Sequence, residues 1–186
     1  MIESLEVKGI APFKKKRKFL FKPGLNAIVG ENGSGKTRLL KTIATLCGWP
    51  LRYMGGEHFD ILEHELRNAT AKLTTSTGSA SLVLRETKGN KRLVMECVNT
   101  DCVSAINFQN FIVPGKTYSA RLSALLTIYN EMGDDEVLLI DEYNLSIFDK
   151  DSQRKAIEGL SKGKAQVITT TFGDPALEKH ANVIRI

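Results

Sequence analysis

The sequence predicts an α/β fold in a single domain, residues 1–186, with a mainly parallel core sheet, an antiparallel β subdomain and flanking helices. Three observations carry this prediction. An apolar run at 25–29 leads through a glycine-rich loop into a helical pattern at 38–46. A second run, 136–142, has the β-forming residues of a strand buried on both faces, as in parallel sheets. Alternating or β-rich stretches at 2–8 and 80–97 indicate antiparallel strands.

Composition and charge narrow the class of protein. The chain is 42% hydrophobic and 25% charged, which is ordinary for a soluble globular protein. No apolar run approaches the roughly 20 residues of a membrane span. Residues 1–6 are acidic and alternating, unlike a signal peptide, so we expect a cytoplasmic protein without a membrane partner. The formal net charge of +5 permits nucleic-acid binding without establishing it.

The cysteines and histidines favour neither disulfides nor a metal site. The cysteines are odd in number and lack a C-x-x-C pair, which favours reduced thiols over a disulfide or zinc site. The histidines are scattered along the chain, so a metal site built from them is disfavoured. These residues are Cys47, Cys97 and Cys102, and His58, His64 and His180.

The first predicted strand, 2–8, is followed by a turn at 9–13 and a second strand at 19–21. Five consecutive cations precede the second strand: Lys14, Lys15, Lys16, Arg17 and Lys18. One interpretation is contact with a nucleic-acid backbone, where each neutralised phosphate releases counterions. The other is a solvated hairpin or a guarded edge strand, because lysines protect sheet edges from further pairing. The sequence leaves both interpretations open.

The loop after the predicted strand at 25–29 matches the phosphate-binding P-loop pattern G-x-x-x-x-G-K-[ST]. It consists of Gly30, Glu31, Asn32, Gly33, Ser34, Gly35, Lys36 and Thr37. The glycines let the backbone turn so that successive N–H groups point inward, where a triphosphate would also meet the N-terminus of the helix. Lys36 would reach the β- and γ-phosphates and assist catalysis, and the Thr37 hydroxyl would bind Mg²⁺.

The sequence predicts two helices and three strands in the middle of the chain. A helical pattern covers 57–68, and 80–85 with 91–97 predict a hairpin inserted after the P-loop helix. A strand at 105–110 and a helix at 119–132 follow. The helix carries an apolar stripe of Leu122, Leu125, Leu126 and Tyr129.

An acidic pair ends the apolar run at 136–142. Open α/β sheets bind ligands at the carboxyl ends of their strands, where Asp141 and Glu142 would lie. This is a Walker B pattern, in which Asp141 would hold Mg²⁺ and Glu142 would orient and deprotonate the attacking water. The alternative is an ordinary buried strand with a polar exit, and the P-loop upstream favours the site over it.

The C-terminal part predicts a helix, a buried strand, a short helix and a last strand. Asp151 is expected to cap a helix over 152–160, which ends before Gly163. Residues 165–170 form a buried strand, and Asp174 starts a short helix with a proline at its first position. Residues 181–186 close the chain as a strand.

The order of these pieces resembles the ABC-type ATPases, and within them the SMC/RecF group that works on DNA. Residues 1–48, above all the run PGLNAIVGENGSGKT at 23–37, are similar to the opening of that group. Residues 138–171 are similar to its end, and QVITTT at 166–171 resembles the RecF form of the switch strand, with threonine where transporter ATPases carry histidine. The resemblance covers roughly half the chain and implies a P-loop NTPase of the ABC head type with ATP and Mg²⁺ as cofactors.

The resemblance also implies roles for residues outside the two Walker motifs. Gln109 is the candidate Q-loop residue that senses Mg²⁺, and a surface glutamine is the alternative. Ser119 lies where the signature helix should begin and would contact the γ-phosphate across a dimer, although the family's glycine and glutamine are missing after it. Residues 148–149 fall near the D-loop position, and Thr171 or Thr170 takes the place of the switch histidine.

The implied head is compact. Nine residues lie between Gln109 and Ser119, too few for a coiled-coil arm or a helical lobe. Residues 1–110 would form mainly the nucleotide-binding lobe with its hairpin insertion, 111–135 a short signature-helix region, and 136–186 the Walker B and switch strands.

The leading hypothesis for function is Mg²⁺-dependent ATP hydrolysis through an ATP-sandwiched head-to-tail homodimer that serves DNA repair, recombination or genome maintenance. The alternative is an ATP-dependent regulatory or assembly module that docks a nuclease or effector protein and binds no DNA itself. A transporter subunit is disfavoured by the missing lobe and the poor signature. A small-molecule kinase is disfavoured by the Asp-Glu pair and the antiparallel N-terminal strands.

Overall fold

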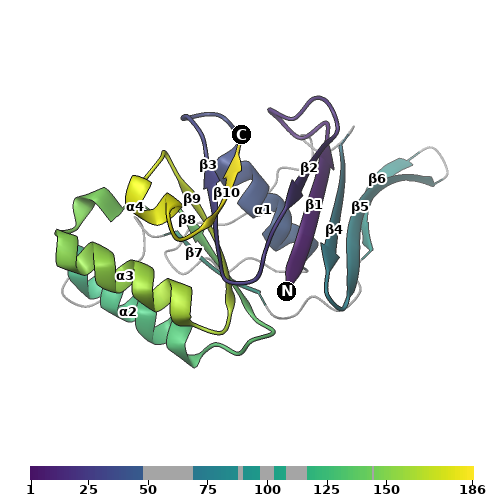
Figure 1. Ribbon diagram of the computed structural model, residues 1–186. Coiled ribbons are helices and arrows are strands. Elements are labelled where there is room, and N and C mark those ends of the chain that lie inside the picture. Colours follow the sequence, from purple (N-terminus) through teal and green to yellow (C-terminus); the bar gives the residue numbers. More distant parts are fainter. Residues whose placement is uncertain (48–68, 88–89, 97–102, 108–116, 144) are drawn as a thin grey trace.

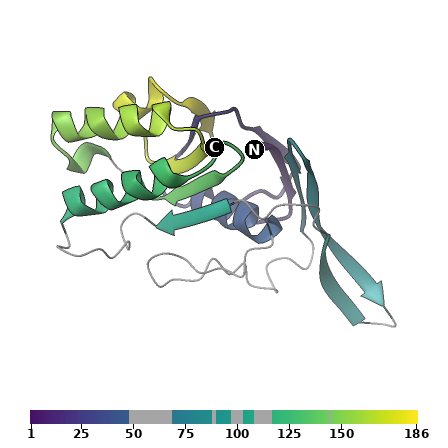
Figure 2. The same cartoon turned by 90° about the horizontal axis from the view of Figure 1, so that it is seen from below.

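The computed structural model describes residues 1–47, 69–87, 90–96, 103–107, 117–143 and 145–186, and these contain two five-stranded sheets (Figure 1). The antiparallel sheet has the order β2-β1-β4-β5-β6. Its strands are β1 (Ile2–Lys8), β2 (Arg17–Leu20), β4 (Thr70–Thr75), β5 (Gly78–Thr87) and β6 (Asn90–Glu96). The β5–β6 hairpin extends away from the rest of the molecule (Figure 2).

The second sheet is parallel throughout and has the order β10-β3-β9-β8-β7. Its strands are β3 (Leu25–Val29), β7 (Val103–Asn107), β8 (Val137–Asp141), β9 (Gln166–Thr171) and β10 (Asn182–Arg185). Every residue of β3, β8 and β9 is buried, as expected for the central strands of a sheet covered on both faces.

Helices cover the two faces of the parallel sheet (Figure 1). Helix α1 (Lys36–Leu46) lies between the two sheets, and Leu39 and Ile43 share one apolar core with β1 and β4. Helices α2 (Tyr118–Glu131), α3 (Lys150–Lys162) and α4 (Pro175–Glu178) share the other core with the opposite face. A 3₁₀ turn, η2 (Leu145–Ile147), precedes α3.

Successive side chains of a strand point to opposite faces of the sheet, so neighbouring strand residues belong to different cores. In β8, Val137 and Leu139 face the α1 side, whereas Leu138 and Ile140 pack with α2 and α3. The sheet therefore holds its strand ends rigidly between two apolar layers. Within the described part of the chain, no helix combines the length and the apolar character that crossing a bilayer requires.

Gln166 joins the two sheets at the start of β9. Its side chain is fully buried; Oε1 accepts a hydrogen bond from the N–H of Ile2 at 2.8 Å, and Nε2 donates to the carbonyls of Ile2 and Lys22 at 2.8 and 2.9 Å. These bonds satisfy backbone groups at the start of β1 and after β2. The antiparallel sheet is thereby fixed against the strand that carries part of the candidate site.

The predicted fold class is confirmed, and most predicted elements lie within a few residues of the observed ones. One prediction was wrong: Asp149, not Asp151, caps α3, because its side chain accepts hydrogen bonds from the N–H groups of Asp151 and Ser152. Strand β4 was not predicted as a separate element, and β7 begins two residues earlier than expected. The helix predicted at 57–68 lies outside the described residues.

Candidate functional site

The loop between β3 and α1 has the backbone shape that its glycines permit. Gly33 and Gly35 have φ angles of 77° and 101°, which residues with a Cβ rarely adopt. A Cβ on Gly35 would also lie 2.5 Å from Cδ of Pro12 and 2.8 Å from Cζ of Phe13. Only glycine fits at position 35, because the loop and the 9–13 turn approach each other there.

Lys36 lies inside this loop. Its side chain is buried, and Nζ donates hydrogen bonds to the carbonyls of Gly30 and Glu31 at 2.8 and 2.7 Å. Nζ also lies 4.6 Å from the centre of the Phe172 ring. Burial lowers the pKa of Lys36, and the nearby Asp141 and Glu142 act in the opposite direction. The ammonium group is thus held at the loop by polar contacts that an anion could replace.

Asp141 ends β8 directly beside the start of α1. Its Oδ1 accepts hydrogen bonds from Oγ1 of Thr37 at 3.0 Å and from Oγ1 of Thr170 at 2.7 Å. The side chain is buried, and burial raises the pKa of Asp141, while the two hydroxyl donors oppose that shift. A hydroxyl and a carboxylate side by side form the hard oxygen donor set that suits Mg²⁺.

Glu142 follows in a strained backbone conformation. Its φ is 57°, the left-handed region, and its N–H donates to Oγ1 of Thr170 at 2.8 Å. The next N–H, that of Tyr143, donates to the carbonyl of Thr170 at 3.0 Å. The two acidic residues therefore lie in different environments: Asp141 is buried against α1, whereas Glu142 is half-buried and lines a cavity.

This cavity has a volume of about 560 Å³, within the usual range for a small-molecule site. It is lined by five residues of the P-loop and by three residues at the ends of β8 and β9: Glu142, Thr170 and Thr171. The remaining lining residues are Ala11, Pro12, Arg38, Lys41 and Phe172. The P-loop and Glu142, which are more than a hundred residues apart in the sequence, thus line one cavity, and Asp141 is buried directly beside it.

The sequence analysis did not predict five of the residues that line the cavity: Ala11, Pro12, Arg38, Lys41 and Phe172. Ala11 and Pro12 reach the cavity from the turn after β1, and Arg38 and Lys41 from the first turns of α1. Phe172 follows β9 and is 50% exposed, with its ring beside the Lys36 ammonium. The spacing of 38 and 41 on the helix after a P-loop was an available signal, but no local pattern marked Phe172.

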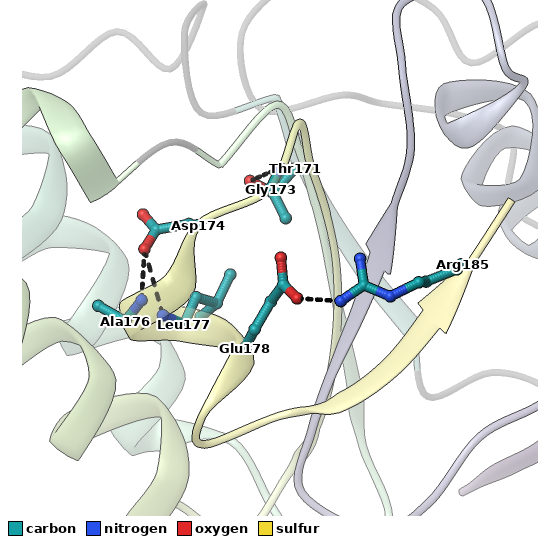
Figure 3. A network of polar contacts seen from close by, with 7 residues as sticks. All are labelled: Thr171, Gly173, Asp174, Ala176, Leu177, Glu178 and Arg185. Atoms are coloured by element: carbon teal, nitrogen blue, oxygen red, sulfur yellow. Dashed lines mark hydrogen bonds and ion pairs between the residues drawn. The ribbon is translucent and has the colours of Figure 1, made fainter.

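The segment after β9 is held by its own polar contacts (Figure 3). The N–H of Gly173, a residue with φ of 123°, donates to Oγ1 of Thr171, and Asp174 caps α4 by accepting from the N–H groups of its second and third helical residues. Glu178 on α4 forms an ion pair with Arg185 on β10. These contacts fix the exit of β9, and hence the place of Phe172 at the cavity.

The residues present fit a phosphate group and a divalent cation. Oγ of Ser34 is buried and has no hydrogen-bond partner among the described residues, within a loop whose glycines leave no room for side chains at 30 and 35. A bound phosphate would give such a hydroxyl a partner. Thr37 and Asp141 are the oxygen donors that could hold a divalent cation beside that phosphate.

Among the remaining predicted site residues that the structure describes, Ser119 stands apart from this cavity. Ser119 is exposed in the first turn of α2, 3.1 Å from Oγ1 of Thr117, and it does not line the cavity of its own chain. Gln109 lies outside the described residues. Thr171 lines the cavity, whereas the single hydroxyl proton of Thr170 is donated to Asp141.

The five cations at 14–18 lie on an edge strand and the turn before it. Lys16 forms an ion pair with Glu6 on β1, and the Arg17 guanidinium lies over the rings of Phe13 and Phe19, 5.7 and 5.2 Å from their centres. Lys14, Lys15 and Lys18 are exposed. All five cations are exposed, and two of them, Lys16 and Arg17, also have structural contacts within the antiparallel sheet.

Comparison with known proteins decides the family. The model of the AAA domain family matches residues 4–174. The chain belongs to the AAA domain family. No curated protein matches it.

Among solved structures, the chain is similar to the SMC head domain from Thermotoga maritima, with 14% identity, a TM-score of 0.62, and coverage of 99% of this chain and 94% of that one. It is equally similar to an SMC head bound to the C-winged helix domain of ScpA, with 14% identity, a TM-score of 0.63 and the same coverage. This AAA domain therefore has the fold of an SMC-like ABC ATPase head, as the sequence predicted.

Proposed function

We propose that this AAA domain binds and hydrolyses ATP with Mg²⁺. The observation that carries the proposal is the convergence of the P-loop and the acidic pair: Oγ1 of Thr37 lies 3.0 Å from Oδ1 of Asp141, and both segments face one cavity. Phosphoryl transfer needs positioning and charge neutralisation more than covalent chemistry, and this arrangement supplies both.

Each residue has a proposed role. The backbone N–H groups of 30–37 and the Lys36 ammonium would hold the triphosphate. Thr37 and Asp141 would hold Mg²⁺, with Gln109 as a further ligand. Bound there, Mg²⁺ would neutralise charge on the β- and γ-phosphates.

The chain's own groups then supply the remaining chemistry. The Lys36 ammonium exchanges the carbonyls of Gly30 and Glu31 for phosphate oxygens, since hydrogen bonds to an anion are the stronger ones. The Glu142 carboxyl faces the cavity and accepts a proton from the attacking water. The hydroxyl groups of Thr37 and Thr170 donate hydrogen bonds to Asp141, which favours its charged form against the effect of burial.

The test is ATP turnover by the Glu142→Gln variant. We expect turnover to fall by about 100-fold or more, because the amide cannot accept a proton, while ATP affinity stays within about threefold of the parent. Glu158→Gln, an exposed change on α3, is the matched control and should leave both unchanged. If Glu142→Gln turns over like the parent, the proposed role of Glu142 is wrong.

We further propose that ATP joins two copies head to tail, with Ser119 of one copy covering the nucleotide of the other. Its exposure at the start of α2, away from its own cavity, supports this arrangement. The biological role we favour is DNA repair, recombination or genome maintenance, with DNA contacting the exposed lysines at 14, 15 and 18.

A second candidate function is an ATP-dependent module that docks an effector protein such as a nuclease. The observation in its favour is that one structurally similar SMC head is bound to a winged helix domain of another protein. Affinity purification with tagged Glu142→Gln protein, with and without ATP, separates the candidates. ATP-dependent recovery of a protein partner in the absence of DNA supports docking, and recovery only through DNA contradicts it.

A further inference from the structure

Thr170 is the side chain that links the two acidic residues of the site. It lies on β9, between the P-loop strand β3 and the acidic strand β8. Its Oγ1 donates to Oδ1 of Asp141 at 2.7 Å and accepts from the N–H of Glu142 at 2.8 Å. One hydroxyl group therefore contacts the side chain of the first acid and the backbone of the second, and both of its strong hydrogen-bonding directions are in use.

The bond to the N–H of Glu142 falls at a strained point of the chain. Among the described residues, Glu142 is the one non-glycine residue with a positive φ, 57°. Such a conformation persists only where surrounding contacts determine it, and strain of this kind concentrates at functional sites. Two of the contacts at this point come from Thr170: its Oγ1 accepts a hydrogen bond from the N–H of Glu142, and its carbonyl accepts one from the N–H of Tyr143 at 3.0 Å.

The neighbouring residue on the same strand, Thr169, provides a comparison for the hydroxyl of Thr170. Thr169 is equally buried, yet its Oγ1 has no hydrogen-bond partner among the described residues. Strand β9 thus accommodates a buried threonine whether or not its hydroxyl is paired. The two contacts of Thr170 are specific to the acidic pair, and valine has the same shape without them.

We propose that Thr170 is a positioning residue that sets the direction of the Glu142 carboxyl and holds Asp141 beside Thr37. This inference rests on the proposed ATP hydrolysis. The hydroxyl of Thr170 anchors the left-handed turn at Glu142, so the carboxyl faces the cavity instead of following the strand. Because the same hydroxyl holds Oδ1 of Asp141, the two acids keep a fixed separation.

The experiment compares Thr170→Val and Thr170→Cys, which remove or weaken the hydroxyl contacts, with Thr170→Ser, which keeps them. Thr169→Val is the matched control on the same strand. For each purified full chain, turnover at saturating ATP, ATP affinity, the melting temperature and the amide hydrogen exchange of Glu142 are measured, the last by NMR.

We expect Thr170→Val to lower turnover by about 100-fold while ATP affinity stays within about threefold, because misplacing a reacting group costs rate more than binding. Exchange of the Glu142 amide should accelerate at least about tenfold, since its acceptor is gone. Thr170→Ser should keep turnover within about fivefold of the parent. Thr169→Val should change neither turnover nor the exchange of the Glu142 amide.

Three results would overturn the inference: unchanged Glu142 exchange in Thr170→Val, turnover within about twofold of the parent, or no rescue by Thr170→Ser. If Thr170→Val does not fold, Thr170→Cys gives the same comparison. If the parent itself does not hydrolyse ATP, the proposed function fails, and the exchange of the Glu142 amide still decides whether Thr170 fixes that turn.

Discussion

The carboxyl group of Asp141 is buried, and its negative charge does not stabilise the folded chain. Burial raises its pKa, which means that the folded chain binds a proton there more tightly than the unfolded chain does. This tighter proton binding stabilises the fold at a pH below the ordinary carboxyl pKa. The contribution is lost as the pH rises through the raised pKa of Asp141 in the folded chain. At neutral pH the charge of Asp141 therefore destabilises the fold, as expected of a group retained for binding.

This predicts that Asp141→Asn raises the melting temperature of the ligand-free protein at pH 7 to 8. The amide oxygen can still accept the hydroxyl bonds of Thr37 and Thr170, while the cost of burying a charge is removed. The gain should shrink as the pH falls toward about 4, where the parent carboxyl is protonated too. Thermal unfolding of both proteins across this pH range measures the effect.

Asp149→Asn serves as a control, because it should change the melting temperature at pH 7 in the opposite direction from Asp141→Asn. Hydrogen bonds from Ser152 and from the N–H groups of the first turn of α3 lower the pKa of Asp149, so its ionised form stabilises the fold. The substitution should therefore lower the melting temperature at pH 7, with an effect that fades as the pH falls. If Asp141→Asn also lowers the melting temperature at pH 7, its charge is compensated in the folded state and our account of its burial is wrong.

Local sequence patterns were enough to find the P-loop and the acidic pair, because each is a short run that precedes or follows a buried strand. The sequence offered Thr170 only as an alternative to Thr171 at the switch position, without its contacts to the acidic pair, and it gave Phe172 no role. Their roles depend on β9 lying between β3 and β8, which is a property of the sheet order and not of the residues around position 170. The contact of Pro12 with Gly35 is likewise tertiary.

At the scale of elements, the edge strand β2 and the turn before it carry the exposed lysines at 14, 15 and 18. If they contact DNA, replacing all three by glutamine should weaken duplex binding by at least about tenfold and reduce its dependence on salt, because each lost phosphate contact removes released counterions. Fluorescence anisotropy at several salt concentrations measures both effects.

The matched control removes the same charge by replacing three exposed lysines on α3 and directly after it: Lys150, Lys155 and Lys164. Equal weakening in both variants would indicate a general effect of net charge and contradict a contact at β2. If the β2 variant binds DNA normally but aggregates, the lysines protect a sheet edge instead.

The antiparallel sheet shows why element positions were predicted better than their pairing. The sequence indicated strands at 2–8, which alternates, and at 80–85 and 91–97, which are rich in β-forming residues. It did not indicate that β4 pairs with β1, because that pairing joins segments about seventy residues apart. The cap of α3 was misassigned by two residues for a local reason: Asp149 and Asp151 are both good caps, and the path of η2 into the helix selects the first.

At the scale of the whole molecule, the account predicts an ATP-dependent dimer. The Glu142→Gln variant should elute at twice the mass of the 20.6 kDa chain when ATP and Mg²⁺ are present, and as a single chain without them. Retained ATP would hold two copies together, because Ser119 of each copy is proposed to cover the nucleotide of the other. Size-exclusion chromatography with light scattering measures the mass.

Lys36→Ala, which removes the phosphate-binding cation, should remain a single chain under both conditions. A Glu142→Gln protein that binds ATP and stays at the mass of one chain would contradict the shared site, and would leave Ser119 without the role proposed for it.

Isothermal titration calorimetry of ATP into the parent chain and into Lys36→Ala, with and without Mg²⁺, tests the central claim most directly. The account predicts saturable binding by the parent that Mg²⁺ strengthens, and a loss of at least about 100-fold in affinity when the ammonium is removed from the desolvated loop. Equal ATP binding by both proteins, or no binding by the parent at any Mg²⁺ concentration, would contradict it.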